Sequence, residues 1–144
     1  MIVMKITDAI AEKLSAEFPE TVLYTEEVKQ GLETPCFFIL PISVSDVRHT
    51  GHRWLAVYSM CAQYVPGSDE PKAECAEIEE SLYKLLEYIT VDGKTIAGID
   101  IHSETTDEVL SFFVSYRILT LEEPEEAAEI MAQAKEDLNV KEKN

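Results

Sequence analysis

The sequence predicts an α+β fold: an antiparallel or mixed β-sheet built from two long hairpins, with helices packed on it, in the order α-β-ββ-α-ββ-α. Three segments carry apolar residues at helical spacing, and two pairs of β-rich segments are each joined by a short turn. No helical segment separates the strands of either pair, as parallel pairing would require. A chain of 144 residues holds one compact domain. We expect this domain over residues 1–121, followed by an acidic helical extension with a frayed end over residues 122–144.

The first helix is expected over residues 4–17, where apolar residues recur every four positions from Ile6 to Phe18. Thr7 and Asp8 suit its first turn, and Pro19 ends it. A short β-rich segment follows at residues 21–24. Turn-forming residues at 30–31 and 34–35 then lead the chain into a long strand over residues 36–47.

The first hairpin joins that strand to a second β-rich segment at residues 53–65, through a loop at residues 48–52 that contains Gly51. Alternation in the first strand predicts which side chains face the core. The residues expected on the core face are Phe38, Leu40, Ile42 and Val44. The opposite face, which carries Phe37 and Ile39, is expected to be partly covered.

A second helix is expected over residues 69–89, with Ser68 or Asp69 as its cap and an apolar stripe along one side. That stripe consists of Ile78, Leu82, Leu85 and Ile89. The second hairpin pairs residues 95–103 with a strictly alternating segment at residues 110–118, through a turn at residues 105–108. Beyond residue 121, Pro124 suits the start of a third helix, whose thin apolar stripe has few large residues. That stripe consists of Ala127, Ile130, Met131, Ala134 and Leu138.

The charge balance excludes two classes of partner. The chain has 28 acidic and 12 basic residues, so its formal net charge is −16, while 46% of its residues are hydrophobic, as in a folded domain. A surface this acidic is repelled by nucleic acid and by anionic membranes. No apolar run is long enough to span a bilayer, and Asp8 and Glu12 interrupt any signal-peptide core, so we expect a cytoplasmic protein.

Few residues in the sequence have the spacing of a catalytic or metal-binding motif. The three cysteines form an odd set without a CxxC motif, which favours buried free thiols. His49 and His52 form an HxxH with Asp46 nearby, a weak metal motif without a second ligand pair, and His102 is alone in a strand. No nucleophile motif or glycine-rich phosphate loop is present. We therefore expect no catalytic group, cofactor or metal.

One short block of the sequence resembles the opening block of a family of small tailed-phage and prophage proteins, the tail terminators or tail completion proteins. The block covers residues 24–39, and the order of helix and hairpins follows the family over about residues 1–120. The matching motif residues are Tyr24, Gln30, Gly31, Pro35, Phe37, Phe38 and Ile39. They are structural residues, and none of them is a catalytic group.

The resemblance implies a structural protein of virion assembly, with no cofactor or turnover. It implies a ring, expected to be hexameric, that caps a finished tail tube, stops tube polymerisation and offers a surface for joining the head. The partners implied are further copies of the chain, the tail tube protein and the head-completion or connector protein. Assembly would take place in the host cytoplasm, and the protein would then belong to the virion tail. The alternatives are a small cytoplasmic metal-binding or enzymatic protein centred on the His49/His52 loop, and a protein–protein adaptor without a phage role.

Two segments are candidate subunit interfaces. Arg48, His49, His52 and Arg53 gather basic groups in an acidic chain, and we expect them to meet an acidic surface such as the 69–87 helix of an adjacent subunit. The alternative is a solvated turn.

The second candidate is the stripe formed by Ile130, Met131, Ala134 and Leu138, which is expected to dock on a neighbour, on the tube or on the chain's own sheet. Residues 69–89 and 122–144 each carry a net charge of −5. An acidic ring around a DNA passage would let phosphates slide past.

Overall fold

The computed structural model describes residues 2–26, 30–51 and 53–121, without the side chains of residues 46–49, 120 and 121. The expected third helix, with Ile130, Met131, Ala134 and Leu138, lies outside the described residues, as does His52. The division of the chain at residue 121 therefore stays a prediction.

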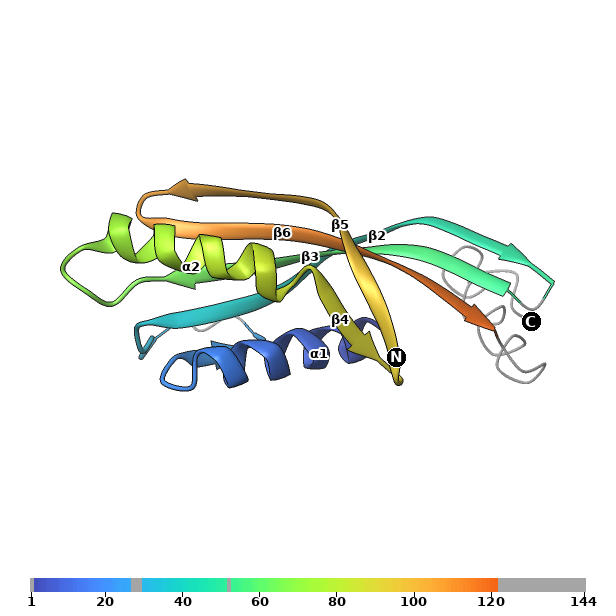
Figure 1. The fold of residues 1–144 in the computed structure, drawn as a ribbon, viewed down its shortest axis with the longest axis horizontal. Helices are drawn as coiled ribbons and strands as arrows, with labels where there is room; N and C mark the ends of the chain where they lie inside the picture. Colours follow the sequence, from blue (N-terminus) through green and yellow to red (C-terminus); the bar gives the residue numbers. More distant parts are fainter. Residues whose placement is uncertain (1, 27–29, 52, 122–144) are drawn as a thin grey trace.

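Two helices and a six-stranded mixed sheet make up the described chain, which confirms the α+β fold. The elements, in chain order, are α1 (Ile2–Glu17), β1 (Val22–Tyr24), β2 (Cys36–Thr50), β3 (Arg53–Val65), α2 (Pro71–Leu85), β4 (Tyr88–Val91), β5 (Lys94–Thr106) and β6 (Val109–Leu121). The strand order is β1-β2-β3-β6-β5-β4, in which β1 pairs parallel with β2 and every other pair is antiparallel. Figure 1 shows β2, β3 and β6 running on beyond both helices.

Helix α1 confirms the first predicted helix but begins earlier than expected. Ile6, Ile10 and Leu14 are buried against the sheet, as their spacing predicted. Because the helix starts at Ile2, Thr7 lies inside it, and the Thr7 hydroxyl donates to the Val3 carbonyl at 2.9 Å. The expectation that Thr7 and Asp8 form the first turn was therefore wrong.

Helix α2 is shorter than the predicted helix at both ends. Its N-cap is Glu70, which makes no side-chain cap bond, and Pro71 opens the helix, so the expected cap at Ser68 or Asp69 was wrong. Ile89 is buried, but it belongs to strand β4 and not to the helix. The helix ends early because residues 88–91 pair with β5 and alternate between buried and exposed, which is the period of a strand.

In the first part of β2, residues 36–40, the face that packs on the core is the opposite of the predicted one. Phe37 and Ile39 are fully buried, whereas Ile42 is 54% exposed and Val44 49% exposed. Both faces of β2 are apolar, so alternation alone does not decide between them, and register shifts after Pro41 and after Ser45 interrupt the alternation. Strand β2 also continues to Thr50, so most of the expected loop at residues 48–52 is strand.

The second hairpin has the predicted arms, and its turn holds Asp107 and Glu108 both at positive φ, as a two-residue turn of type I′ requires. The first hairpin likewise pairs the predicted arms and turns at Gly51, whose φ is 59°.

The core lies between the helices and one side of the sheet, which we call the covered face. Helix α1 contacts β2 and β4, and α2 contacts β5 and β6. Tyr116 is fully buried there, and its hydroxyl donates to the Leu86 carbonyl at 2.7 Å. At Gly98 a Cβ atom would lie 2.7 Å from a Val114 methyl carbon, so only glycine fits this tight packing.

Candidate functional site

The side of the sheet that faces away from both helices, which we call the outer face, is the most distinctive surface of the described chain. The continuous β3–β6 register places every second residue of these strands on it, opposite the core residues. With its partners on β2 and β5, this face comprises Phe38, Leu40, Ser43, Ser45, Thr50, Arg53, Leu55, Val57, Ser59, Cys61, Gln63, Ile99, His102, Glu104, Ser111, Phe113, Ser115, Arg117 and Leu119. No described element covers it.

In the middle of the outer face, side chains of neighbouring strands contact one another. The rings of Phe113 and His102 stack with their centroids 4.8 Å apart, and the Ser59 and Ser115 hydroxyls share a hydrogen bond of 2.9 Å. Cys61 is 4% exposed beside them, and burial raises the pKa of its thiol, so the thiol stays protonated. All three cysteines are buried and free, which confirms the prediction.

The outer face opens toward the ends of the long strands, a part that we call the arm: residues 44–50, 53–57 and 117–121. A surface depression here is lined by Thr50, Arg53, Leu55 and Leu119. Leu119 is 48% exposed, and Arg53 is exposed at the rim. On β6, Arg117 is also exposed, opposite Val57 in the register. The arm therefore combines exposed apolar surface with two guanidinium groups.

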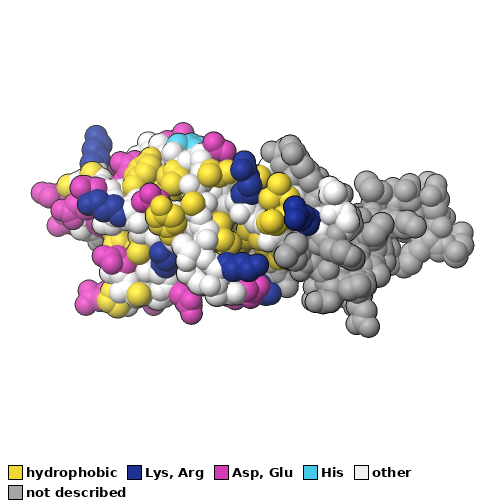
Figure 2. Space-filling view, turned by 45° about the vertical axis from the view of Figure 1, so that its right-hand side comes forward, with side chains coloured by type: hydrophobic (Ala, Val, Ile, Leu, Met, Phe, Trp, Pro, Cys, Tyr) yellow, Lys and Arg dark blue, Asp and Glu magenta, His cyan; other side chains and the backbone are white. Residues whose placement is uncertain are grey.

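These two arginines have no carboxylate partner within the described part of the chain. The one ion pair that the described residues make joins Lys5 to Asp92 at 2.9 Å, between α1 and the β4–β5 turn. Figure 2 shows a side of the molecule on which yellow hydrophobic side chains lie among dark-blue Lys and Arg toward the right of the coloured surface. Asp and Glu are more numerous toward the left. Positive charge and exposed apolar surface thus occur together in an acidic protein.

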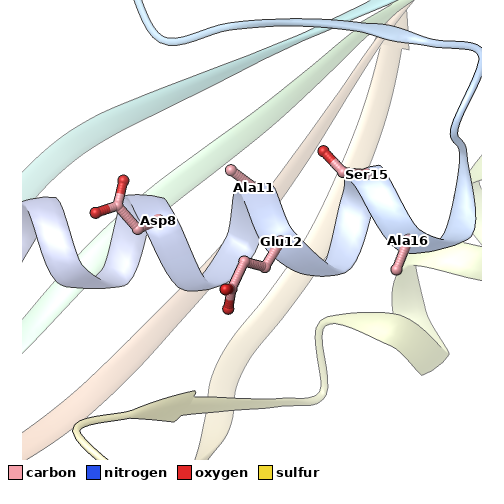
Figure 3. A pocket seen from close by; sticks show the side chains of 5 residues that line it. All are labelled: Asp8, Ala11, Glu12, Ser15 and Ala16. Atoms are coloured by element: carbon pink, nitrogen blue, oxygen red, sulfur yellow. The ribbon is translucent and has the colours of Figure 1, made fainter.

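A second depression in the described part of the chain does not form a reaction centre. It lies along α1 and is lined by Asp8, Ala11, Glu12, Ser15 and Ala16. Figure 3 shows these side chains spread along the helix and pointing to different sides of it, so the two carboxylates do not converge. Among the described residues, no group of three His, Cys, Asp or Glu side chains could hold a metal ion. Neither described helix is long and apolar enough to span a membrane.

The motif residues of the 24–39 block have structural positions. The Tyr24 ring stacks on Phe38 at 5.2 Å, and its hydroxyl accepts from the Glu33 amide at 3.1 Å. Phe37 is fully buried against Phe18 and Tyr64. The contacts of Tyr24 hold Glu33 and Phe38 beside the end of β1, and in the described part of the connection to β2, Gly31 has φ +73° and Pro35 follows a cis peptide bond. Gln30 is exposed near the middle of this connection.

Of the predicted interface residues, Arg53 lines the depression of the arm. The β2–β3 register pairs Arg48 with Leu55 and His49 with Trp54, but the side chains of both β2 residues are not described. The HxxH motif therefore stays untested.

Sequence reasoning missed Leu55, Arg117 and Leu119. Strict alternation in residues 110–118 had separated Arg117 from the core positions, and extending that alternation to Leu119 would have placed both residues on the uncovered side.

A single sheet with both helices on one side and apolar surface on the other is typical of proteins that pack against further protein surfaces. A comparison with family models makes this class specific. Residues 5–128 match the model of the phage tail terminator protein family, and the chain belongs to this family. It is thus a structural protein of the phage tail, and the resemblance of residues 24–39 is confirmed.

Two further comparisons add little. No curated protein matches the chain. A solved structure is similar at 12% identity with a TM-score of 0.38, over 85% of this chain and 94% of that chain. A TM-score this low carries no argument about fold or function.

Proposed function

We propose that the chain forms a ring, hexameric by expectation, on the end of a completed tail tube, where it stops polymerisation and presents a surface to the head. Family membership over residues 5–128 is the observation that carries this proposal. The protein acts by binding and not by turnover. Its partners are further copies of the chain, the tail tube protein and the head-completion or connector protein, met in the host cytoplasm before the protein becomes part of the virion tail.

The arm supports ring formation. It extends beyond both helices (Figure 1). Val44, which pairs with Tyr58, lies on the helix side of the arm and is 49% exposed. A small sheet under two helices needs no such extension. A projecting element that inserts into the next subunit makes a heterologous contact, and such contacts close into rings.

The tip of the arm is the proposed contact with a neighbouring subunit. Arg48 and Arg53 belong to it, and the acidic surface of α2 is its proposed partner, because Glu77 and Glu80 are exposed on the helix and Glu87 is exposed just after it. Complementary charge of this kind sets the register of a contact more than its strength. In the finished ring, the acidic surface would also let DNA pass without holding it.

Electron microscopy of the purified protein mixed with tail tubes tests the capping role. Tube protein from the same phage or prophage is allowed to polymerise with and without the chain added in excess. We expect a ring at one end of each tube and arrested growth. Tubes that keep growing to the same lengths, with bare ends, would overturn the proposal.

Charge reversal at the tip tests the subunit contact separately. We expect Arg48→Glu with Arg53→Glu to lower the assembly size measured by light scattering, while circular dichroism stays unchanged. Lys94→Glu, an exposed change at the β4–β5 turn, is the control and should leave assembly intact. Unchanged assembly size in the double variant would eliminate the tip as the contact. Elemental analysis of the same preparations tests the metal-binding alternative, which predicts bound metal.

A further inference from the structure

We infer that residues 122–144, the C-terminal segment, fold back over the outer face of their own sheet and cover it from the arm to Phe113. This inference concerns the single subunit and does not depend on the ring. The outer face is thus covered by the same chain, and not by a neighbouring copy or by the tail tube. Three features of the described residues favour that occupant.

The first feature is where the described chain ends. Leu121 pairs with Arg53 at the end of the arm, so the next residue leaves the sheet beside the depression lined by Thr50, Leu55 and Leu119. Residues 122 and 123 suffice for a turn before a helix that begins at Pro124, since connections of about two residues between strand and helix are common. The segment therefore reaches its own outer face without a long linker.

The second feature is length. The stretch of β6 from Leu119 back to Phe113 measures about 20 Å at the usual rise of a strand. A helix over residues 124–138 measures about 21 Å. Its apolar stripe would thus run from the exposed Leu119 to the half-buried ring of Phe113. Small residues in that stripe allow a close approach of the helix to the sheet.

The third feature is the order of charges. Five of the eight acids of the segment lie in residues 122–129, next to the strand end, while residues 130–144 carry three lysines and three acids and are neutral overall. On the outer face, Arg117 lies in the arm, in the row of Val57. A helix folded back along β6 brings the acids at its start next to Arg117, so that opposite charges meet at this end. Such pairs fix orientation more than they add stability.

The family match ends at residue 128, so the larger part of this cover belongs to the chain and not to the family model. With the outer face from Leu119 to Phe113 occupied by its own chain, the tip of the arm with Arg53 and the helix side, where Val44 is exposed, are left for a neighbouring subunit.

Methyl NMR on the full chain tests the inference directly. With Met, Leu and Val methyl groups labelled, we expect nuclear Overhauser contacts from Met131 to Leu55, Val57 or Leu119. A second sample mixes chains labelled only at Met with chains labelled only at Leu and Val. The contacts should vanish in the mixed sample, because they join residues of one chain.

Contacts that appear in the mixed sample would show a segment exchanged between subunits, and the absence of contacts in either sample would show an uncovered outer face. Either result overturns the inference. Neither result bears on tube capping, which the microscopy measures by itself.

A charge variant adds a second measurement. Arg117→Glu should speed amide hydrogen exchange in residues 124–138 about two- to fivefold, the range that one or two exposed charge pairs allow. Lys94→Glu is the matched control, since it removes a cation outside the outer face and should leave this exchange unchanged. Equal exchange in wild type and the Arg117→Glu variant would contradict the charge argument and the docking that it supports.

Discussion

The covered face and the outer face are built from alternating residues of the same strands, yet they differ in what buries them. On the covered face, the helices bury Phe37, Phe112 and Tyr116 completely. On the outer face, Val57 is only 8% exposed although no element among the described residues packs above it. Leu119, at the end of the same face, is 48% exposed. The open apolar surface of the sheet is therefore concentrated in the arm, and docking there gains the most burial.

Alanine substitutions at two adjacent phenylalanines test the difference between the two faces, and they are expected to give the largest effect on stability. Phe37→Ala removes a fully buried ring that packs on Phe18 and Tyr64, and should lower the free energy of unfolding by about 3–5 kcal/mol. Phe38→Ala removes a half-buried outer-face ring that stacks on Tyr24, and should cost about 1–2 kcal/mol. Urea denaturation measures both.

The two substitutions control for each other, since they delete the same ring from neighbouring positions of one strand. Equal losses of stability, or a larger loss at Phe38, would mean that the outer face of β2 is buried in the isolated protein as deeply as the covered face.

Replacing a carboxylate at the edge of the covered face, that of Glu74, is expected to have an intermediate effect on stability. Glu74 accepts from the Gly67 amide at 3.1 Å, from the Ser68 amide at 2.9 Å and from the Tyr64 hydroxyl. Partial burial raises the pKa of Glu74, but these hydrogen bonds outweigh it, and the pKa lies below its ordinary value of 4.5. Glu74→Gln should cost about 1.5–3 kcal/mol at neutral pH, the usual loss for hydrogen bonds to a charged group.

The loss should depend on pH with a definite sign. A depressed pKa in the folded state stabilises the protein above the ordinary value of 4.5, and this contribution is lost as the pH falls through the lower folded pKa. The difference between wild type and the Glu74→Gln variant should therefore shrink below pH 4.5. Glu77→Gln, on the exposed side of the same helix, is the control. A difference that persists unchanged into acid would contradict the role of the charged form.

The contrast between the two faces also decides what could be predicted from the sequence. Helix α1 and the second hairpin follow from spacing, because each has one apolar side, as in the series that contains Leu110, Phe112 and Val114. Strand β2 is apolar on both sides, so its pattern does not say which side the helices cover, and Phe37 was assigned to the wrong one. Burial decides this, and burial depends on distant segments.

The candidate site was only partly predictable for the same reason. Arg53 stood out as a basic residue in an acidic chain, but Leu55, Arg117 and Leu119 come together through the pairing of β3 with β6, which are far apart in the sequence. Strand β4 was missed because its four residues continue the spacing of the preceding helix through Ile89.

Removing one hydroxyl of a bonded pair in the middle of the outer face is expected to have the smallest effect on stability. Ser59 is half-buried and Ser115 is 8% exposed, and their hydroxyls bond to each other at 2.9 Å without a covering element among the described residues. Ser115→Ala should cost about 0.5–1.5 kcal/mol, because it leaves the Ser59 hydroxyl without its partner.

The double variant Ser59→Ala with Ser115→Ala should recover part of this loss, since replacing both partners by apolar groups leaves no unpaired hydroxyl. The coupling energy from the double-mutant cycle in urea then measures the bond itself. An additive double variant would mean that each hydroxyl already has another partner, such as water or a residue beyond Leu121. Repeating the cycle at the Ser103 hydroxyl, which contacts Tyr83 and Glu79 under α2, provides the matching measurement on the covered face.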